Sequence, residues 1–166
     1  MVAVLAMQAE GSTPEPTARK EPRAKASTPG PGGEKRETPH LLPKESGEGK
    51  RVVYSLGRDR VWLVGGSGDK PFDTFAVWPG SVRPGVGEHK VTGLRDAIVG
   101  SDGIPVVRVV YFSRAGGSAA AFSAARDGAS PEPVPGKNTG AIRLRTDDSK
   151  SLWGFVKVGT DVVVVR

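Results

Sequence analysis

The 166-residue sequence contains no cysteine. This absence excludes disulfides, thiolate metal ligands and a cysteine nucleophile, and it leaves the redox compartment open. Histidine is almost as scarce, with only His40 and His89 available as a general base. The acids Asp73, Asp102 and Asp127 lack the spacing of a metal site or a carboxylate pair. We therefore expect neither a metal nor a cofactor.

Aromatic residues are missing from the first fifty positions, since all ten of them lie further along the chain. Residues 1–50 instead hold seven of the fourteen prolines, with Ser, Thr, Glu and Lys filling most of the rest. Such a segment buries too little apolar surface to offset chain entropy. We predict a disordered tail or spacer over residues 1–50, reaching roughly 40 Å, and a folded domain over residues 51–166.

The chain has no long hydrophobic run. Its first residues, "MVAVLAM", are too few for a transmembrane helix or a signal core, and no basic region precedes them. Two interpretations stay open: a frayed N-terminus, or the end of an export or anchor segment that begins upstream. The spacer that follows keeps the second one worth testing. We expect membrane contact only through such an anchor.

The net charge of +6 divides into +1 for the tail and +5 for the domain, which favours acidic partners. The basic residues are scattered singly, without interleaved aromatics or a nucleic-acid-binding motif. We therefore predict no nucleic-acid partner. A basic nucleic-acid-binding module remains a third class of function, and salt-dependent binding of DNA or RNA would reveal it.

The domain is predicted to be mainly β. β-Branched and alternating runs predict a hairpin and several further strands, whereas the alanine-rich run at 118–125 is ambiguous between helix and strand. A single short helix is expected late in the chain, capped by Asp147, Asp148 or Ser149 and closed by Gly159. The predicted strands cover residues 51–56 and 60–66 (the hairpin), 72–78, 89–92, 104–113 and 160–166.

The stretch "GKNTGAIRLR", residues 136–145, has the layout of a loop that presents one residue at the mouth of a pocket and then enters a strand. The presented residue is Ala141, which has no reactive group. The stretch "GKNTGAIRLRTDDSKSLWGFVKVGTDVVVV" resembles the C-terminal signature of the YkuD-type L,D-transpeptidase catalytic domain, a Ser/Thr-His-Gly-Cys motif followed by a helix and a Gly-Thr-x-Val strand. "RVVYSLGRDRVWLV" is similar to the family's first hairpin, and "RPGVG" stands near its Thr-Pro-x-Gly loop.

The resemblance implies an L,D-transpeptidase-like β-sandwich or barrel over residues 51–166, with its catalytic parts missing. Asn138 stands for the Ser/Thr, Thr139 for the His, Gly140 for the Gly and Ala141 for the Cys. The family's second histidine would fall at 120–123, where there is none. In the family, the thiolate attacks a peptidoglycan stem peptide with the help of a histidine base and an oxyanion hole.

Arg143 is the remaining candidate for a binding residue. Its planar guanidinium can pair a substrate carboxylate, and the resemblance implies that the residue at this place helps to shape the site. The alternative is a structural ion pair with Asp147, Asp148 or another acid. His89 is interpreted as a structural or surface residue of a strand.

Two hypotheses about function follow. The first is a non-catalytic, extracytoplasmic L,D-transpeptidase-like domain that binds peptidoglycan stem peptide or an envelope protein. The alternative is an active acyl-transferring or peptide-cleaving enzyme with a hydroxyl nucleophile, Ser123 or Thr139. An open cleft beside Ala141 would favour binding, whereas a cleft filled by side chains such as Phe122 would favour a scaffold.

Overall fold

The computed structural model describes residues 40–66, 68, 70–128 and 131–166. The predicted disorder of residues 1–50 falls mostly on residues 1–39, which lie outside the described part. Residues 40–50 contact the first two strands: the Trp62 Nε1–H donates to the carbonyl of His40 at 2.8 Å, and the Arg51 Nε–H donates to that of Ser46 at 2.6 Å. The domain boundary near residue 50 stays a prediction.

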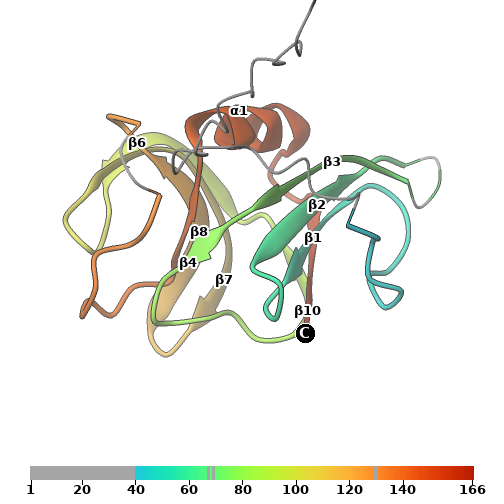
Figure 1. The fold of residues 1–166 in the computed structure, drawn as a ribbon, viewed down its shortest axis with the longest axis horizontal. Coiled ribbons are helices and arrows are strands. Elements are labelled where there is room, and N and C mark those ends of the chain that lie inside the picture. The colour runs from blue at the N-terminus through green and yellow to red at the C-terminus, as the bar shows by residue number, and fades with distance from the viewer. Residues whose placement is uncertain (1–39, 67, 69, 129–130) are drawn as a thin grey trace, which may run out of the picture. The chain divides into compact units, whose positions relative to one another are not determined.

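The described residues form two five-stranded sheets, in the order β3-β2-β1-β10-β5 and β4-β9-β8-β7-β6 (Figure 1). Both sheets are mixed, because β1 pairs with β10 and β8 with β9 in parallel, while their other pairings are antiparallel. The expected mainly β architecture is confirmed. The strands are β1 (Arg51–Ser55), β2 (Arg60–Val64), β3 (Pro71–Ala76), β4 (Trp78–Pro79), β5 (Gly87–Lys90), β6 (Gly93–Val99), β7 (Pro105–Ala115), β8 (Ser118–Ala125), β9 (Ala141–Leu144) and β10 (Asp161–Val165).

Patterns of β-branched residues explain the central strands. The predicted hairpin is β1–β2, and the run predicted over 104–113 is the long strand β7. The ambiguous run at 118–125 forms β8, because its neighbours β7 and β9 supply hydrogen-bond partners on both sides and override the helical preference of alanine. The strand predicted over 89–92 begins earlier, as β5. The edge strand β6 was missed because its exposed polar residues conceal the alternation.

The helix α1 (Thr146–Phe155) was predicted correctly, but its caps were not. Arg145 occupies the N-cap position and makes no side-chain cap hydrogen bond. The proposed cap Ser149 lies inside the helix instead, where its hydroxyl bonds the Thr146 carbonyl at 2.7 Å and accepts from Arg108 Nε–H at 2.8 Å. Gly159, with φ of 90°, shapes the turn before β10 rather than the end of the helix.

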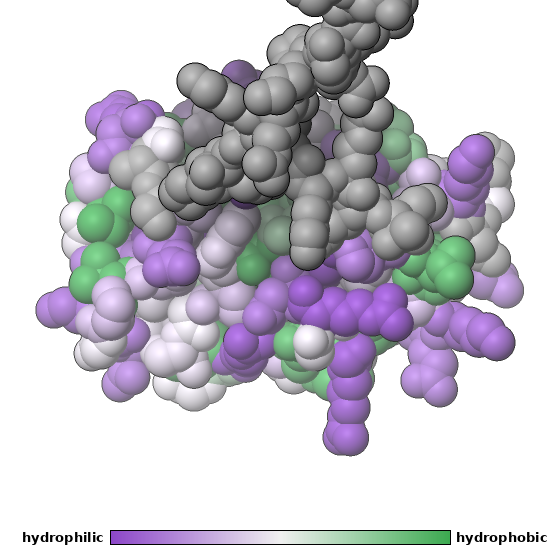
Figure 2. Space-filling view, in the orientation of Figure 1, coloured by the Kyte–Doolittle hydropathy of each residue, from purple (hydrophilic) through white to green (hydrophobic). Residues whose placement is uncertain are grey.

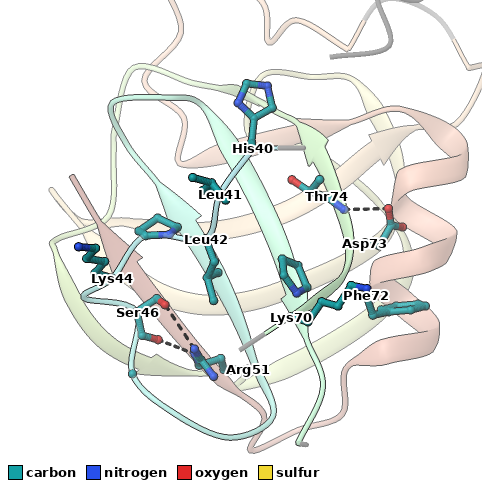
Figure 3. A pocket seen from close by; sticks show the side chains of 13 residues that line it. His40, Leu41, Leu42, Lys44, Ser46, Arg51, Lys70, Phe72, Asp73 and Thr74 are labelled. Atoms are coloured by element: carbon teal, nitrogen blue, oxygen red, sulfur yellow. Dashed lines mark hydrogen bonds between the residues drawn. The ribbon is translucent and has the colours of Figure 1, made fainter. Parts of the chain in front are cut away.

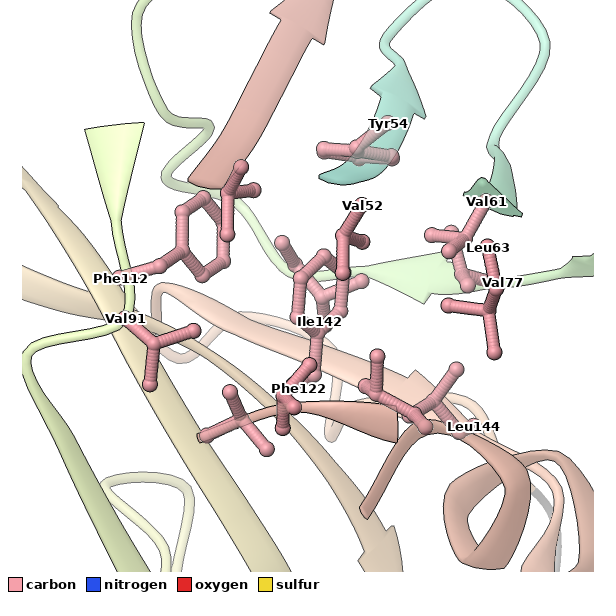
Figure 4. Packing of buried hydrophobic residues seen from close by; sticks show 14 of the residues in the cluster. Val52, Tyr54, Val61, Leu63, Val77, Val91, Phe112, Phe122, Ile142 and Leu144 are labelled. Atoms are coloured by element: carbon pink, nitrogen blue, oxygen red, sulfur yellow. The ribbon is translucent and has the colours of Figure 1, made fainter. Parts of the chain in front are cut away.

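The core lies between the two sheets (Figure 4). Phe112 of β7 and Phe122 of β8 stack with ring centroids 4.7 Å apart, and Tyr54 of β1 meets Phe122 edge-on at 5.9 Å. The helix α1 closes one end of this space and adds Leu152, which is 1% exposed (Figure 1). Burial of this apolar surface is the main stabilising term of the fold.

The visible outer surface of the domain is mostly hydrophilic, with small scattered hydrophobic patches (Figure 2). The large hydrophobic side chains exposed among the described residues lie singly along the chain, at Leu41, Phe72, Val86, Val99 and Val158. Within the described ranges, no helix has the length and apolarity needed to cross a membrane.

Candidate functional site

The motif loop reaches β9 beside β8. Ala141 opens β9 and lies opposite Ala121 of β8 in parallel register. Gly140 must be glycine here, because a Cβ at this position would overlap the Ala119 carbonyl oxygen and lie 3.0 Å from its carbon. The Ala121 N–H donates to the Gly140 carbonyl at 3.2 Å. Close backbone packing therefore holds Ala141 in place.

Thr139 is buried under this loop, with 1% of its surface exposed. Its hydroxyl accepts a hydrogen bond from the Ala141 N–H at 3.1 Å and lies 2.7 Å from the Ser101 hydroxyl. The Ala141 carbonyl accepts from the Gly80 N–H at 2.7 Å. Both backbone polar groups of Ala141 are thus engaged within the protein, and its N–H is not free to hold an oxyanion.

A cavity of about 440 Å³ opens directly beside Ala141. It lies over the face of the second sheet that points away from the core, and small side chains form most of its floor. Phe122 does not enter it, because that ring is 1% exposed and packed in the core. The cleft is therefore open rather than filled. The lining residues other than glycine are Ile98, Val99, Ser101, Val106, Val109, Tyr111, Ser118, Ala119, Ala121, Ser123, Thr139, Ala141 and Arg143.

Arg143 is the only charged residue among these lining residues. Its side chain is 2% exposed, and its guanidinium donates to Asp102 Oδ2 at 2.5 Å and to the Ser123 hydroxyl at 2.7 Å. The acid that pairs with Arg143 is therefore Asp102, and neither Asp147 nor Asp148 takes this place. Burial raises the pKa of Asp102, but the hydrogen bond and charge of Arg143 outweigh it and hold that pKa below its ordinary value.

No pattern in the sequence indicates that Asp102 pairs with Arg143, because 41 residues separate the two. It sits in the turn between β6 and β7, which closes through hydrogen bonds between Gly100 and Gly103 and between Gly100 and Ile104. The ion pair requires glycine at position 100, because a Cβ there would lie 2.6 Å from Asp102 Oδ1. Only the hairpin brings this acid to Arg143.

No histidine borders the cavity in the part of the chain that the structure describes. His89 is on β5 of the other sheet, where its Nε2 lies 2.8 Å from the Gly85 carbonyl and its ring meets Phe112 edge-on at 6.1 Å. At the position expected for the family's second histidine, Ala121 and Ser123 face the cavity. Among the described residues, no cluster of three His, Cys, Asp or Glu side chains could hold a metal ion.

Asn138, the first motif position, is exposed and does not border the cavity. Arg143 does border it, but with its guanidinium already paired to Asp102. Contact between Arg143 and a ligand therefore remains a proposal.

A larger cavity, of about 910 Å³, lies between residues 40–47 and the edge strand β3 (Figure 3). It contains no motif position. The guanidinium of Arg51 on its wall is held by Ser46 and Gly49. The cavity beside Ala141, rather than this one, is therefore the candidate site.

The fold matches solved L,D-transpeptidase structures at low sequence identity. The L,D-transpeptidase from Stackebrandtia nassauensis superposes with a TM-score of 0.57 and 18% identity, over 80% of this chain and 62% of that one. The L,D-transpeptidase from Xylanimonas cellulosilytica superposes with a TM-score of 0.55 and 19% identity, over 74% of this chain and 62% of that one. The L,D-transpeptidase from Mycobacterium smegmatis superposes with a TM-score of 0.56 and 13% identity, over 72% of this chain and 60% of that one. No family model and no curated protein matches the sequence.

These matches confirm the L,D-transpeptidase fold that the resemblance implied. At such identities they establish the fold alone. The chain spans 62% of the length of the first two structures. What this chain binds, and whether it catalyses a reaction, has to be argued from its own residues.

Proposed function

We propose that this domain binds a peptidoglycan stem peptide in the cavity beside Ala141 without catalysing acyl transfer. The observation that carries the proposal is an open cavity of about 440 Å³ on an L,D-transpeptidase fold, with alanine at the nucleophile position. This volume is within the usual range of ligand sites. We further propose an extracytoplasmic location, as this ligand requires.

The residues around the cavity argue against catalysis. Alanine has no proton to give and no nucleophilic atom, so neighbouring charges cannot activate it. The Thr139 hydroxyl is buried and already bonded to Ser101 and to the Ala141 N–H. The Ser123 hydroxyl accepts from Arg143, and no lining residue of the described cavity is a histidine or carboxylate that could take its proton.

The same residues suit the binding of a peptide. The floor of small side chains lets a peptide backbone approach the sheet closely, while the Ser118 hydroxyl offers a hydrogen-bonding group. Val99, which is 68% exposed, adds apolar contact surface. Polar and apolar surface contribute about equally to this hollow, which suits a peptide that needs both hydrogen bonds and apolar contact.

Titration of the isotope-labelled full chain with a synthetic stem tetrapeptide tests the proposal. We expect saturable shifts of the Ala121, Gly140 and Ala141 amide signals. Ala141→Leu fills the cavity and should abolish them, whereas Ala97→Leu makes the same change at an exposed position of β6 and should have no effect. Binding that is unaffected by Ala141→Leu would place the ligand elsewhere and refute the proposal.

Mass spectrometry after incubation with a carbapenem separates binding from catalysis. We expect no covalent adduct, because the nucleophile position is Ala141. A stoichiometric adduct would support the enzymatic alternative, and the modified residue would identify the hydroxyl nucleophile.

A further inference from the structure

A second hollow, of about 710 Å³, adjoins the cavity beside Ala141. The two share Tyr111 and Ala119, so they adjoin on the outward face of the second sheet, and we call the two hollows together the groove. The strands that it crosses, β8, β7 and β6, lie side by side in Figure 1. The lining residues of this second part are Thr92, Gly93, Arg95, Tyr111, Ser113, Arg114 and Ala119.

The strand register gives the length of the groove. Ala141 pairs with Ala121, Ala121 with Tyr111, and Tyr111 with Gly93, which makes one row across four strands. Three interstrand spacings amount to roughly 14 Å. An extended chain of about four residues covers this distance.

The far end of the groove is basic. Arg95 and Arg114 are both exposed and are the only charged lining residues of the second hollow. Arg95 donates to the carbonyl of its own neighbour Leu94 at 2.9 Å, and in the described ranges neither arginine is paired with a carboxylate. The adjacent acid, Asp96, does not line the groove. Two guanidinium groups on one hollow without a counter-charge are suited to an anion.

We propose that Arg95 and Arg114 form a carboxylate-binding subsite, and that the groove holds an extended anionic peptide of about four residues running from Ala141 to these arginines. The inference rests on the proposed function in taking the cavity beside Ala141 as the other end of the site. It adds the charge, length and direction of the ligand. Charge complementarity favours this occupant over a neutral or basic one.

Two stem tetrapeptides that differ only in whether their carboxylates are free or amidated test the subsite in the full chain. We expect the free acid to bind wild-type protein about tenfold more tightly, as charge-assisted hydrogen bonds at a partly solvated site predict. The Arg95→Gln/Arg114→Gln variant should lose about the same factor for the acid and nothing for the amide. The matched control is Arg126→Gln, an exposed arginine just past the opposite end of β8, roughly 23 Å along the strand from Ala119.

The failures of the two proposals are distinguishable. If the acid and the amide bind equally well at Ala141 in all variants, the subsite is refuted and the proposed function stands. Tetra-alanine with a free carboxylate serves as a probe that is not a stem peptide. If it alone shifts the Arg95 and Arg114 signals, and does so only in wild-type protein, the anion subsite stands and the proposed function fails. If neither probe binds, both proposals fail.

Discussion

Replacing Asp102 by asparagine removes the charge that pairs with Arg143 behind the cavity wall while keeping the shape of the side chain. Arg143 would then remain 2% exposed without its ionic partner. Loss of one member of a buried pair costs about 3–5 kcal/mol, because the other charge stays desolvated. For a domain of this size we expect the melting temperature to fall by roughly 10–20 °C at pH 7.

The pH dependence provides a second readout of the same variant. Because the folded-state pKa of Asp102 lies below its ordinary value of 3.8, its stabilising contribution is present above that value. It is lost as the pH falls through the folded-state pKa. The difference in unfolding free energy between wild type and Asp102→Asn should therefore be constant near neutrality and shrink at acidic pH.

Thermal denaturation at pH 7 measures the first effect, and chemical denaturation from pH 2 to pH 7 measures the second. The matched control is Asp147→Asn, which breaks the exposed Lys150–Asp147 pair and should leave stability nearly unchanged. Gly100→Ala is an independent perturbation, since its Cβ would lie 2.6 Å from Asp102 Oδ1 and 3.1 Å from Arg143 Nη2. If Asp102→Asn is no more destabilising than Asp147→Asn, the pair is not structurally important and the reasoning fails.

Three further predictions concern the helix, the motif loop and the N-terminal segment. Burial is the main cause that raises the pKa of Asp148 to about 6. Asp148→Asn should therefore stabilise the domain by about 1 kcal/mol above pH 6, where the buried carboxylate is charged. Denaturation at pH 4 should show little of this gain, because the carboxyl group is then protonated in the folded state. Gly140→Ala should cost about 1–3 kcal/mol through overlap with the β8 backbone, whereas Gly154→Ala in the open surface of α1 should stabilise by up to about 1 kcal/mol; equal melting temperatures would contradict this. Deleting residues 1–39 should leave the melting temperature nearly unchanged, while deleting residues 1–50 should lower it by removing hydrogen bonds to β1 and β2; equal values would show that those bonds contribute nothing.

The amino-acid sequence by itself determined much of the architecture. Runs such as 104–113 are rich in β-branched and aromatic residues, which pack well only on a pleated surface. The absence of a reactive group at Ala141 is also readable directly, because no fold can give alanine a reactive atom. The resemblance of the motif loop to the L,D-transpeptidase signature then led to the correct fold.

Other features depended on partners distant in sequence, and only the tertiary structure decided them. The run at 118–125 is a strand because β7 and β9 flank it, and no local pattern records that. Arg143 finds Asp102 only through the β6–β7 hairpin. Arg95 and Arg114 line one hollow because the antiparallel strands β6 and β7 place both there. Local patterns reflect backbone preference and burial, whereas pairing between side chains depends on how the strands are arranged in space.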